Sequence, residues 1–201
     1  KMSKSRGTFI MARTYLEVGL EPDALRYYFA CKTSGGVDDL DLNLGDFIAR
    51  VNSDLVGKFV NLASRCAKLL ETHFDNTLGE LPGAAAANAG LTAGWADESQ
   101  ALLANIAGAL AAVPALYEQD NFAAVARNAM AAADLANEYV ARTAPWALAK
   151  DPARRDDLHL VLTTALQAFA DIAGALKPIL PATTGKVEQY LGIGLVPGTR
   201  S

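Results

Sequence analysis

Cysteine and histidine are scarce in this sequence of 201 residues, which contains only two of each. Neither a Cys-x-x-Cys pair nor a histidine-rich cluster occurs, so we expect no zinc or other metal site within the chain. Cys31 and Cys66 are expected to be buried thiols of a cytoplasmic protein, because disulfides are rare in reducing compartments. His73 and His159 have no nucleophile or paired ligand nearby in the sequence, and we expect both to be surface or packing residues.

Long apolar runs and a strong excess of positive charge are also missing. The chain has no stretch of about 18 consecutive apolar residues, so we expect no membrane-spanning segment and no membrane partner. The first residues, KMSKSR, are not followed by the apolar segment that a signal peptide requires. The formal net charge of −4 excludes a uniformly basic nucleic-acid-binding protein. Any contact with nucleic acid would therefore need a local patch.

Alanine, by contrast, is abundant between residues 84 and 175, where strand-forming residues are sparse. Alanine has the highest helix propensity, and about half of the chain is apolar, which is enough for a sizeable core. We therefore predict a mainly α protein, in which a short mixed α/β connective segment (residues 1–43) precedes an α-helical bundle (residues 44–201). Helices are expected at residues 12–18, 22–32, 44–72, 97–117, 121–143, 154–177 and 183–191, with Pro114 splitting or kinking the fourth. A strand is expected at 7–12, and a strand or extended link at 38–43.

The segment 44–72 has the most regular pattern in the chain. Asn43 is suited to cap its first turn, and Asp46 three residues later resembles a capping box. Apolar residues at helical spacing predict one buried stripe: Ile48, Val51, Leu55, Phe59, Leu62, Cys66 and Leu69. At about 100° per residue, a second and polar face lies roughly 100° from this stripe: Arg50, Asp54, Lys58, Asn61, Arg65 and Lys68. Spacing alone favours a solvated flank for this second face.

Several short motifs follow one another along the chain: KMSKS with RGTFI, then DALRYYFA, DDLDLN, RVNSDLVGKFVNLASR, APWALAK and LKPILP. Together they resemble the C-terminal part of bacterial methionyl-tRNA synthetases. The resemblance covers nearly the whole chain and is weakest across residues 79–113. KMSKS alone would indicate only a class I aminoacyl-tRNA synthetase, since the leucine, isoleucine and valine enzymes carry it too. The other motifs make the resemblance specific to the methionine enzyme.

The resemblance implies an enzyme that activates methionine with ATP, in the presence of Mg²⁺, and esterifies it to tRNA(Met). In this family KMSKS is a mobile catalytic loop. Lys4 would stabilise the ATP phosphates as pyrophosphate departs, Lys1 would assist ATP binding, and Ser3 and Ser5 would hydrogen-bond phosphate or shape the loop. The Rossmann-type catalytic domain, the methionine pocket and any zinc-binding insertion are expected upstream of Lys1. We therefore expect this chain alone to be inactive as a ligase.

For residues 44–201 the resemblance implies an anticodon-binding domain that recognises the CAU anticodon of tRNA(Met). Asn61 and Arg65 match family positions that contact the anticodon, and both lie on the polar helix face. Trp146 matches the residue that meets the first anticodon base, where an indole can stack. Pro145 would fix the backbone beside it. The positions that match the family's anticodon contacts thus fall on the polar helix face. This favours anticodon recognition by that face over a merely solvated flank.

The sequence departs from the family pattern at two positions. Gly57 stands where well-known members carry an asparagine, one turn before Asn61. Ala141 stands where an acidic residue often precedes Ala-Pro-Trp. We assign no base-reading role to either, and we expect Trp95, in the poorly matched segment, to be a packing residue.

Two other classes of protein remain open at this point. A stand-alone tRNA-binding module would have no use for Lys4, so an intact KMSKS favours the ligase. A helical scaffold without an RNA role would not gather Asn and Arg on one face near an exposed Trp. Salt-dependent tRNA binding would distinguish it, because phosphate contacts weaken as salt rises.

Overall fold

The computed structural model describes residues 12–17, 19–36, 40, 42–82, 90–192, 194 and 195. The KMSKS residues lie outside this part of the chain. So does most of the strand expected at 7–12, of which Ala12 is described and begins helix α1 (Ala12–Glu17).

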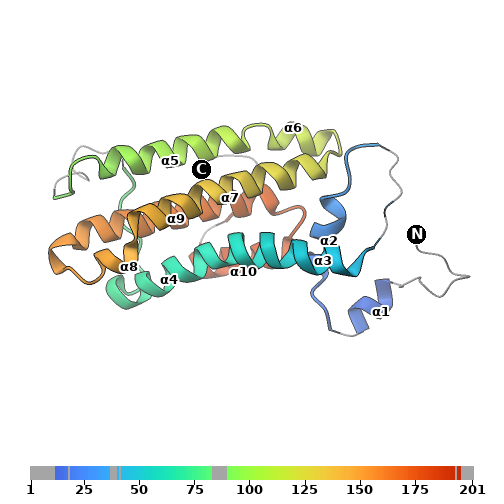
Figure 1. Cartoon of the computed structure of the whole chain (residues 1–201), viewed down its shortest axis with the longest axis horizontal. Helices are drawn as coiled ribbons and strands as arrows, with labels where there is room; N and C mark the ends of the chain where they lie inside the picture. The colour runs from blue at the N-terminus through green and yellow to red at the C-terminus, as the bar shows by residue number, and fades with distance from the viewer. Residues whose placement is uncertain are drawn as a thin grey trace, which may run out of the picture.

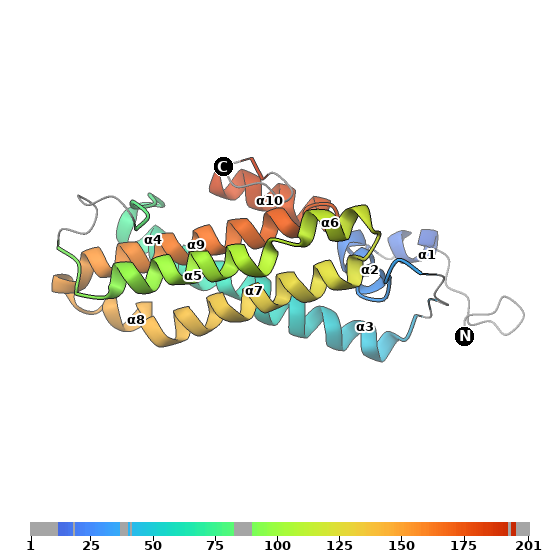
Figure 2. The same ribbon diagram turned by 90° about the horizontal axis from the view of Figure 1, so that it is seen from above.

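Long helices packed side by side make up the body of the molecule (Figures 1 and 2). They are α4 (Asn61–Phe74), α5 (Trp95–Leu110), α7 (Phe122–Thr143) and α9 (Arg155–Leu176). Helix α9 lies at the centre, where it packs against α4, α5 and α7 and is buried along most of its length. The predicted α-helical bundle is confirmed.

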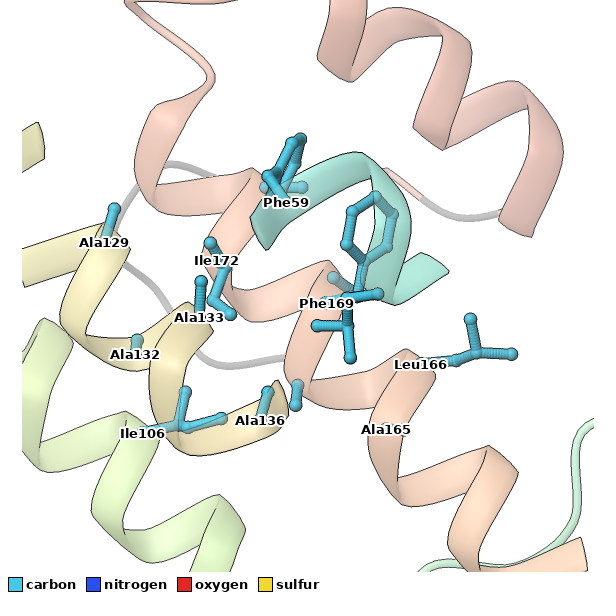
Figure 3. Packing of buried hydrophobic residues seen from close by; sticks show 14 of the residues in the cluster. Phe59, Ile106, Ala129, Ala132, Ala133, Ala136, Ala165, Leu166, Phe169 and Ile172 are labelled. Carbon is cyan, nitrogen blue, oxygen red and sulfur yellow. The ribbon is translucent and has the colours of Figure 1, made fainter. Parts of the chain in front are cut away.

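Alanine sets the spacing of the bundle. Ala132, Ala133 and Ala136 of α7 and Ala165 of α9 are completely buried, and small side chains allow helix axes to approach closely. Larger side chains fill the layer next to them, where the rings of Phe59 and Phe169 lie 4.6 Å apart (Figure 3). The alanine-rich composition is therefore a packing device as well as a source of helix propensity.

Shorter helices pack around the long ones. They are α2 (Pro22–Ala30), α6 (Val113–Glu118), α8 (Pro145–Leu148), the 3₁₀ turn η3 (Pro152–Arg154) and α10 (Pro181–Leu191). Pro114 splits the expected helix at 97–117, as predicted: α5 ends at Leu110, and Pro114 lies in the first turn of α6. A proline is tolerated there because first-turn amides have no partner within the helix.

Of the strand or extended link expected at 38–43, the described residues, Leu40, Leu42 and Asn43, form a link, since none of them lies in a strand. The backbone at Asn43 is extended, with φ −98° and ψ 113°. Its N–H, however, donates to the hydroxyl of Tyr28 at 3.1 Å rather than to another strand. The side chain of Asn43 accepts a hydrogen bond from the backbone N–H of Asp46 at 3.0 Å, which confirms the predicted helix cap. This stretch therefore links two helices.

One continuous helical segment runs from Leu44 to Phe74, as predicted, but it has three parts. They are α3 (Leu44–Arg50), the π-helix η2 (Val51–Val60) and α4. In a π-helix each hydrogen bond spans five residues rather than four, so the turns are wider.

The predicted apolar stripe is only partly correct. Phe59, Leu62 and Cys66 are buried, and Val51, Leu55 and Leu69 are half-buried. Ile48, however, is 56% exposed. Extrapolation at 100° per residue fails across the wide turns of η2, and α3 extends beyond the bundle to contact α2 and η2 (Figure 1).

The scarce residue types pack much as predicted. The ring of His159 stacks on Phe74, with centroids 4.0 Å apart, and His73 is half-buried. Cys66 is buried, and desolvation raises the pKa of its thiol to about 12. Cys31 is only half-buried, and desolvation again raises the pKa of its thiol.

Two helical segments, Trp95–Glu118 and Pro152–Leu176, are long and apolar enough to cross a membrane by length and composition alone. In the second segment, 83% of the most apolar stretch of 18 residues is buried inside the bundle, in keeping with its place as the central helix. In the first segment, Trp95–Glu118, only 22% of the most apolar stretch of 18 residues is buried. It nevertheless presents Leu102, Ile106 and Val113 to the core. One or two such helices are weak grounds for a membrane span.

Candidate nucleic-acid interface

Arg65 and Trp146, far apart in the sequence, meet on the surface of the bundle. The guanidinium carbon of Arg65 lies 4.7 Å from the centre of the Trp146 ring. Arg65 is on α4 and Trp146 on α8, which contact each other at one end of the molecule (Figure 1). The indole is 41% exposed, and Arg65 is exposed as well. A cation and an open aromatic face therefore occupy one surface.

The corner between α7 and α8 explains why this tryptophan points outward. Ala144 ends α7 in the left-handed region, at φ 44° and ψ 61°, and its N–H donates to the carbonyl of Val140 at 3.0 Å. Pro145 then begins α8, where its fixed φ suits the first helical position. Pro145 and Leu148 are buried and anchor the short helix, which leaves Trp146 on its outer side. Pro145 is thus placed to set the backbone of Trp146.

Asn61 lies one helical turn before Arg65 and is the first residue of α4. Its side chain is exposed. Residues four apart on an α-helix face the same side, so Asn61 and Arg65 share a face. An amide that donates and accepts, a guanidinium and an indole therefore border one surface.

The charges elsewhere on the predicted polar face are largely compensated. Lys58 pairs with Asp134 at 2.8 Å, and Lys68 with Glu71 at 2.9 Å. Within the described residues, no ion pair involves Arg65. Its guanidinium therefore keeps its hydrogen-bond donors for a ligand while its plane rests against the indole.

Asp54 belongs to the inner part of this face. Its carboxylate accepts a hydrogen bond from the hydroxyl of Tyr27 at 3.0 Å. Tyr27 is completely buried, and desolvation, together with the neighbouring Cys31 and Asp54, raises the pKa of its hydroxyl. This contact ties α2 to η2, so Asp54 has a structural role.

Gly57 and Ala141, the two departures from the family pattern, are both exposed. Gly57 lies in η2, where an added Cβ would come within 3.1 Å of the carbonyl of Asn52. Neither residue carries a side chain that could bond a base, in keeping with the absence of an assigned role.

Lys1, Ser3, Lys4 and Ser5 lie outside the described residues, so this structure does not bring them together with the Arg65–Trp146 surface. Sequence reasoning also missed Asn137, a half-buried residue of α7 whose side chain bonds the backbone of η2. Its one signal was an amide within an alanine-rich helix, where a polar side chain needs a partner.

Comparison with known proteins identifies relatives of the whole segment. The family described as "tRNA synthetases class I (M)" matches residues 1–67. The methionine–tRNA ligase of Xanthomonas oryzae pv. oryzae (strain PXO99A) is 53% identical over 192 residues, which are 95% of this chain and 25% of that protein. The same protein of Xanthomonas campestris pv. campestris (strain B100) matches equally, at 53% over 192 residues. The chain thus spans about a quarter of the length of these curated relatives.

Solved structures share the fold. Mycobacterium tuberculosis methionyl-tRNA synthetase in complex with methionyl-adenylate superposes with a TM-score of 0.78 at 24% identity, over 98% of this chain and 39% of that one. The apo form of the same enzyme gives a TM-score of 0.74 at 22% identity, over 94% of this chain and 39% of that one. The motifs and the sequence matches thus show that the chain is similar to about a quarter of a methionine–tRNA ligase, and the solved methionyl-tRNA synthetases share its fold.

Proposed function

We propose that this chain reads the CAU anticodon of tRNA(Met) as part of a methionine–tRNA ligase. The observation that carries the proposal is the contact between Arg65 and Trp146, with Asn61 one turn away. Three residues chosen from the sequence for anticodon contact border one exposed surface. A scaffold without an RNA role gives no reason for this arrangement.

The chemistry of the surface suits a single-stranded loop. Anticodon bases can unstack and lie against aromatic or guanidinium planes. An indole offers about 1–3 kcal/mol of stacking per base. Asn61 can bond the edge of a base, and Arg65 can bond a base or a phosphate. The net charge of −4 makes this local arrangement, rather than the overall field, the basis of binding.

The reaction itself is proposed for the whole ligase, of which this chain matches about a quarter. There Lys4 and Lys1 would stabilise the phosphates of ATP bound with Mg²⁺, with Ser3 and Ser5 shaping the loop. The family match at residues 1–67 includes this pentad and supports the assignment. Methionine, ATP and any zinc ion would be bound by the remainder of the ligase.

Titration of the chain with an anticodon stem-loop tests the binding proposal. Tighter binding of a CAU loop than of a loop with its first base replaced is expected, with affinity that falls as salt rises. Equal affinity for the two loops, or affinity insensitive to salt, would contradict it.

A further inference from the structure

The π-helix η2 ends at Val60, immediately before Asn61, which is proposed to read the anticodon. The N–H of Asn61 donates to the carbonyls of Val56 and Lys58, five and three residues earlier, and Asn61 then begins α4. π-Helical turns are rare and occur frequently at functional sites. The orientation of Asn61 and Arg65 therefore depends on how the junction between the wide and the ordinary turns is held.

Asn137 of α7 binds this junction. Its side-chain Nδ2 donates to the carbonyl of Lys58 at 3.1 Å and to the carbonyl of Ala133, in its own helix, at 2.8 Å. The Lys58 carbonyl is one that the N–H of Asn61 also reaches. One half-buried amide thus connects the backbone of α7 to the turn that precedes Asn61.

The other contacts near this turn fix its register less well than the hydrogen bonds of Asn137 do. Lys58 and Asp134 form an ion pair whose side chains are substantially exposed, and such pairs contribute little. Phe59 packs against Phe169 in the core, which sets how deeply the helix is buried. A hydrogen bond to a specific carbonyl constrains direction and register, which apolar packing does only loosely.

Asn137 also connects the two parts of the proposed recognition surface. The helix that carries it ends at Ala144 and turns through Pro145 to present Trp146. The backbone that it binds leads directly to Asn61 and Arg65. A change at Asn137 would therefore move one part of the surface relative to the other.

We propose that Asn137 is a positioning residue for anticodon recognition, whose side-chain amide holds the end of the π-helix in register with α7 and so sets Asn61 and Arg65 against Trp146. This inference rests on the proposed function. Asn137→Asp tests it because aspartate is nearly isosteric but cannot donate to either carbonyl when ionised. Asn137→Ala removes the group altogether. Asn128→Asp is the matched control, since Asn128 is half-buried on the same helix, more than two turns away.

Binding of CAU and first-base-replaced stem-loops would be measured for each variant. The preference for CAU is expected to fall about tenfold in Asn137→Asp and Asn137→Ala, the equivalent of one buried hydrogen bond, and to be retained in Asn128→Asp. Thermal unfolding of each variant confirms that it is folded at the assay temperature. If the wild-type chain discriminates and Asn137→Asp discriminates equally well, the positioning role is overturned.

A measurement without RNA separates this inference from the proposed function. The chain has two tryptophans, so Trp95→Phe leaves Trp146 as the only one, and its fluorescence can be excited selectively over that of the tyrosines. In that background Asn137→Asp is expected to increase acrylamide quenching of Trp146, because Arg65 would cover the ring less well. If the wild-type chain binds both loops equally, the proposed function fails. The quenching measurement then tests the positioning role of Asn137 without RNA. Unchanged acrylamide quenching of Trp146 in Asn137→Asp overturns that role.

Discussion

A guanidinium resting on an exposed indole is a weak contact, worth about 0.5–1 kcal/mol at such sites. In this chain Arg65 lies 4.7 Å from the centre of the Trp146 ring. The pair is strong enough to orient two long side chains and weak enough to be rearranged by an arriving base. Burial of Pro145 and Leu148, rather than the pair itself, keeps Trp146 at the surface.

Trp146→Ala should weaken binding of the CAU stem-loop by about 1–3 kcal/mol, or roughly 5- to 150-fold in dissociation constant, because the stacking surface is lost. Fluorescence anisotropy with labelled stem-loop measures the change, and circular dichroism should show an unaltered helix content. Trp95→Phe is the control, since Trp95 is half-buried with Arg154 over its ring. An unchanged dissociation constant in Trp146→Ala would remove the indole from the binding surface.

Arg65→Lys keeps the charge but loses the planar, multiply donating group. We expect binding to weaken by about 1 kcal/mol while the salt dependence of binding stays the same, because stacking and directed hydrogen bonds are lost and the charge is not. Titrations at several salt concentrations measure both quantities. Binding as tight as wild type would mean that Arg65 acts only as a charge.

At the level of helices, the segment from Leu44 to Phe74 carries one face to the core and another to the proposed ligand. Phe59, Leu62 and Cys66 are buried, whereas Asn61 and Arg65 are exposed. Neighbouring residues in this segment therefore have opposite roles, which makes matched substitutions possible.

Phe59→Ala should destabilise the fold by about 3–5 kcal/mol, because a completely buried ring packed against Phe169 is replaced by a cavity. Val60→Ala, the next residue, should change the free energy of unfolding by less than about 0.5 kcal/mol, since Val60 is 46% exposed. Urea denaturation measures both. A comparable loss in the two variants would show that Phe59 is not a core residue in solution.

Sequence patterns predicted the helices well and their irregularities poorly. The cap at Asn43, the break at Pro114 and the buried positions of Phe59, Leu62 and Cys66 all follow from local rules. The exposure of Ile48 does not, because a π-helix, which the sequence pattern did not reveal, separates it from the buried positions of α4, and α3 packs chiefly against α2 and η2 rather than the long helices of the bundle. Asn137 was missed because its partner is a backbone carbonyl made available by that same irregular segment.

The stretch 38–43, where the pattern left a strand and an extended link open, illustrates a second limit. Alternating polar and apolar residues favour a strand only if a neighbouring strand accepts its hydrogen bonds. Here the N–H of Asn43 is satisfied by Tyr28, a side chain brought close by tertiary packing. The proximity of Arg65 to Trp146 likewise required the fold, although both residues were chosen from sequence motifs.

Across the whole molecule, buried polar groups fix the connections around the central helix. Asp157 of α9 is buried and accepts hydrogen bonds from the N–H and hydroxyl of Thr92, at 2.9 and 2.7 Å, and from Arg154. Desolvation alone would raise the pKa of this carboxyl. The bonds from Thr92 and the contact with Arg154 outweigh it, so the pKa is lowered.

A lowered pKa in the folded state means that the Asp157 carboxylate stabilises the fold at neutral pH. This contribution is present above the pKa of the unfolded chain, about 3.9, and is lost as the pH falls through the lower pKa of the folded state. Asp157→Asn should therefore lower the melting temperature at pH 7, and the difference from wild type should shrink towards pH 3. Melting curves across this range measure it. A difference that stays constant with pH would contradict a stabilising role for the charge.

The central claim concerns recognition of CAU by the surface around Arg65 and Trp146. The most direct test is competition for the chain between an unlabelled CAU stem-loop and three copies in which only the first anticodon base is changed. We predict that the CAU loop competes best, and that Trp146→Ala removes this preference. Equal competition by all four loops would contradict the claim, because it would leave the surface without the ability to read the base that its tryptophan is proposed to stack upon.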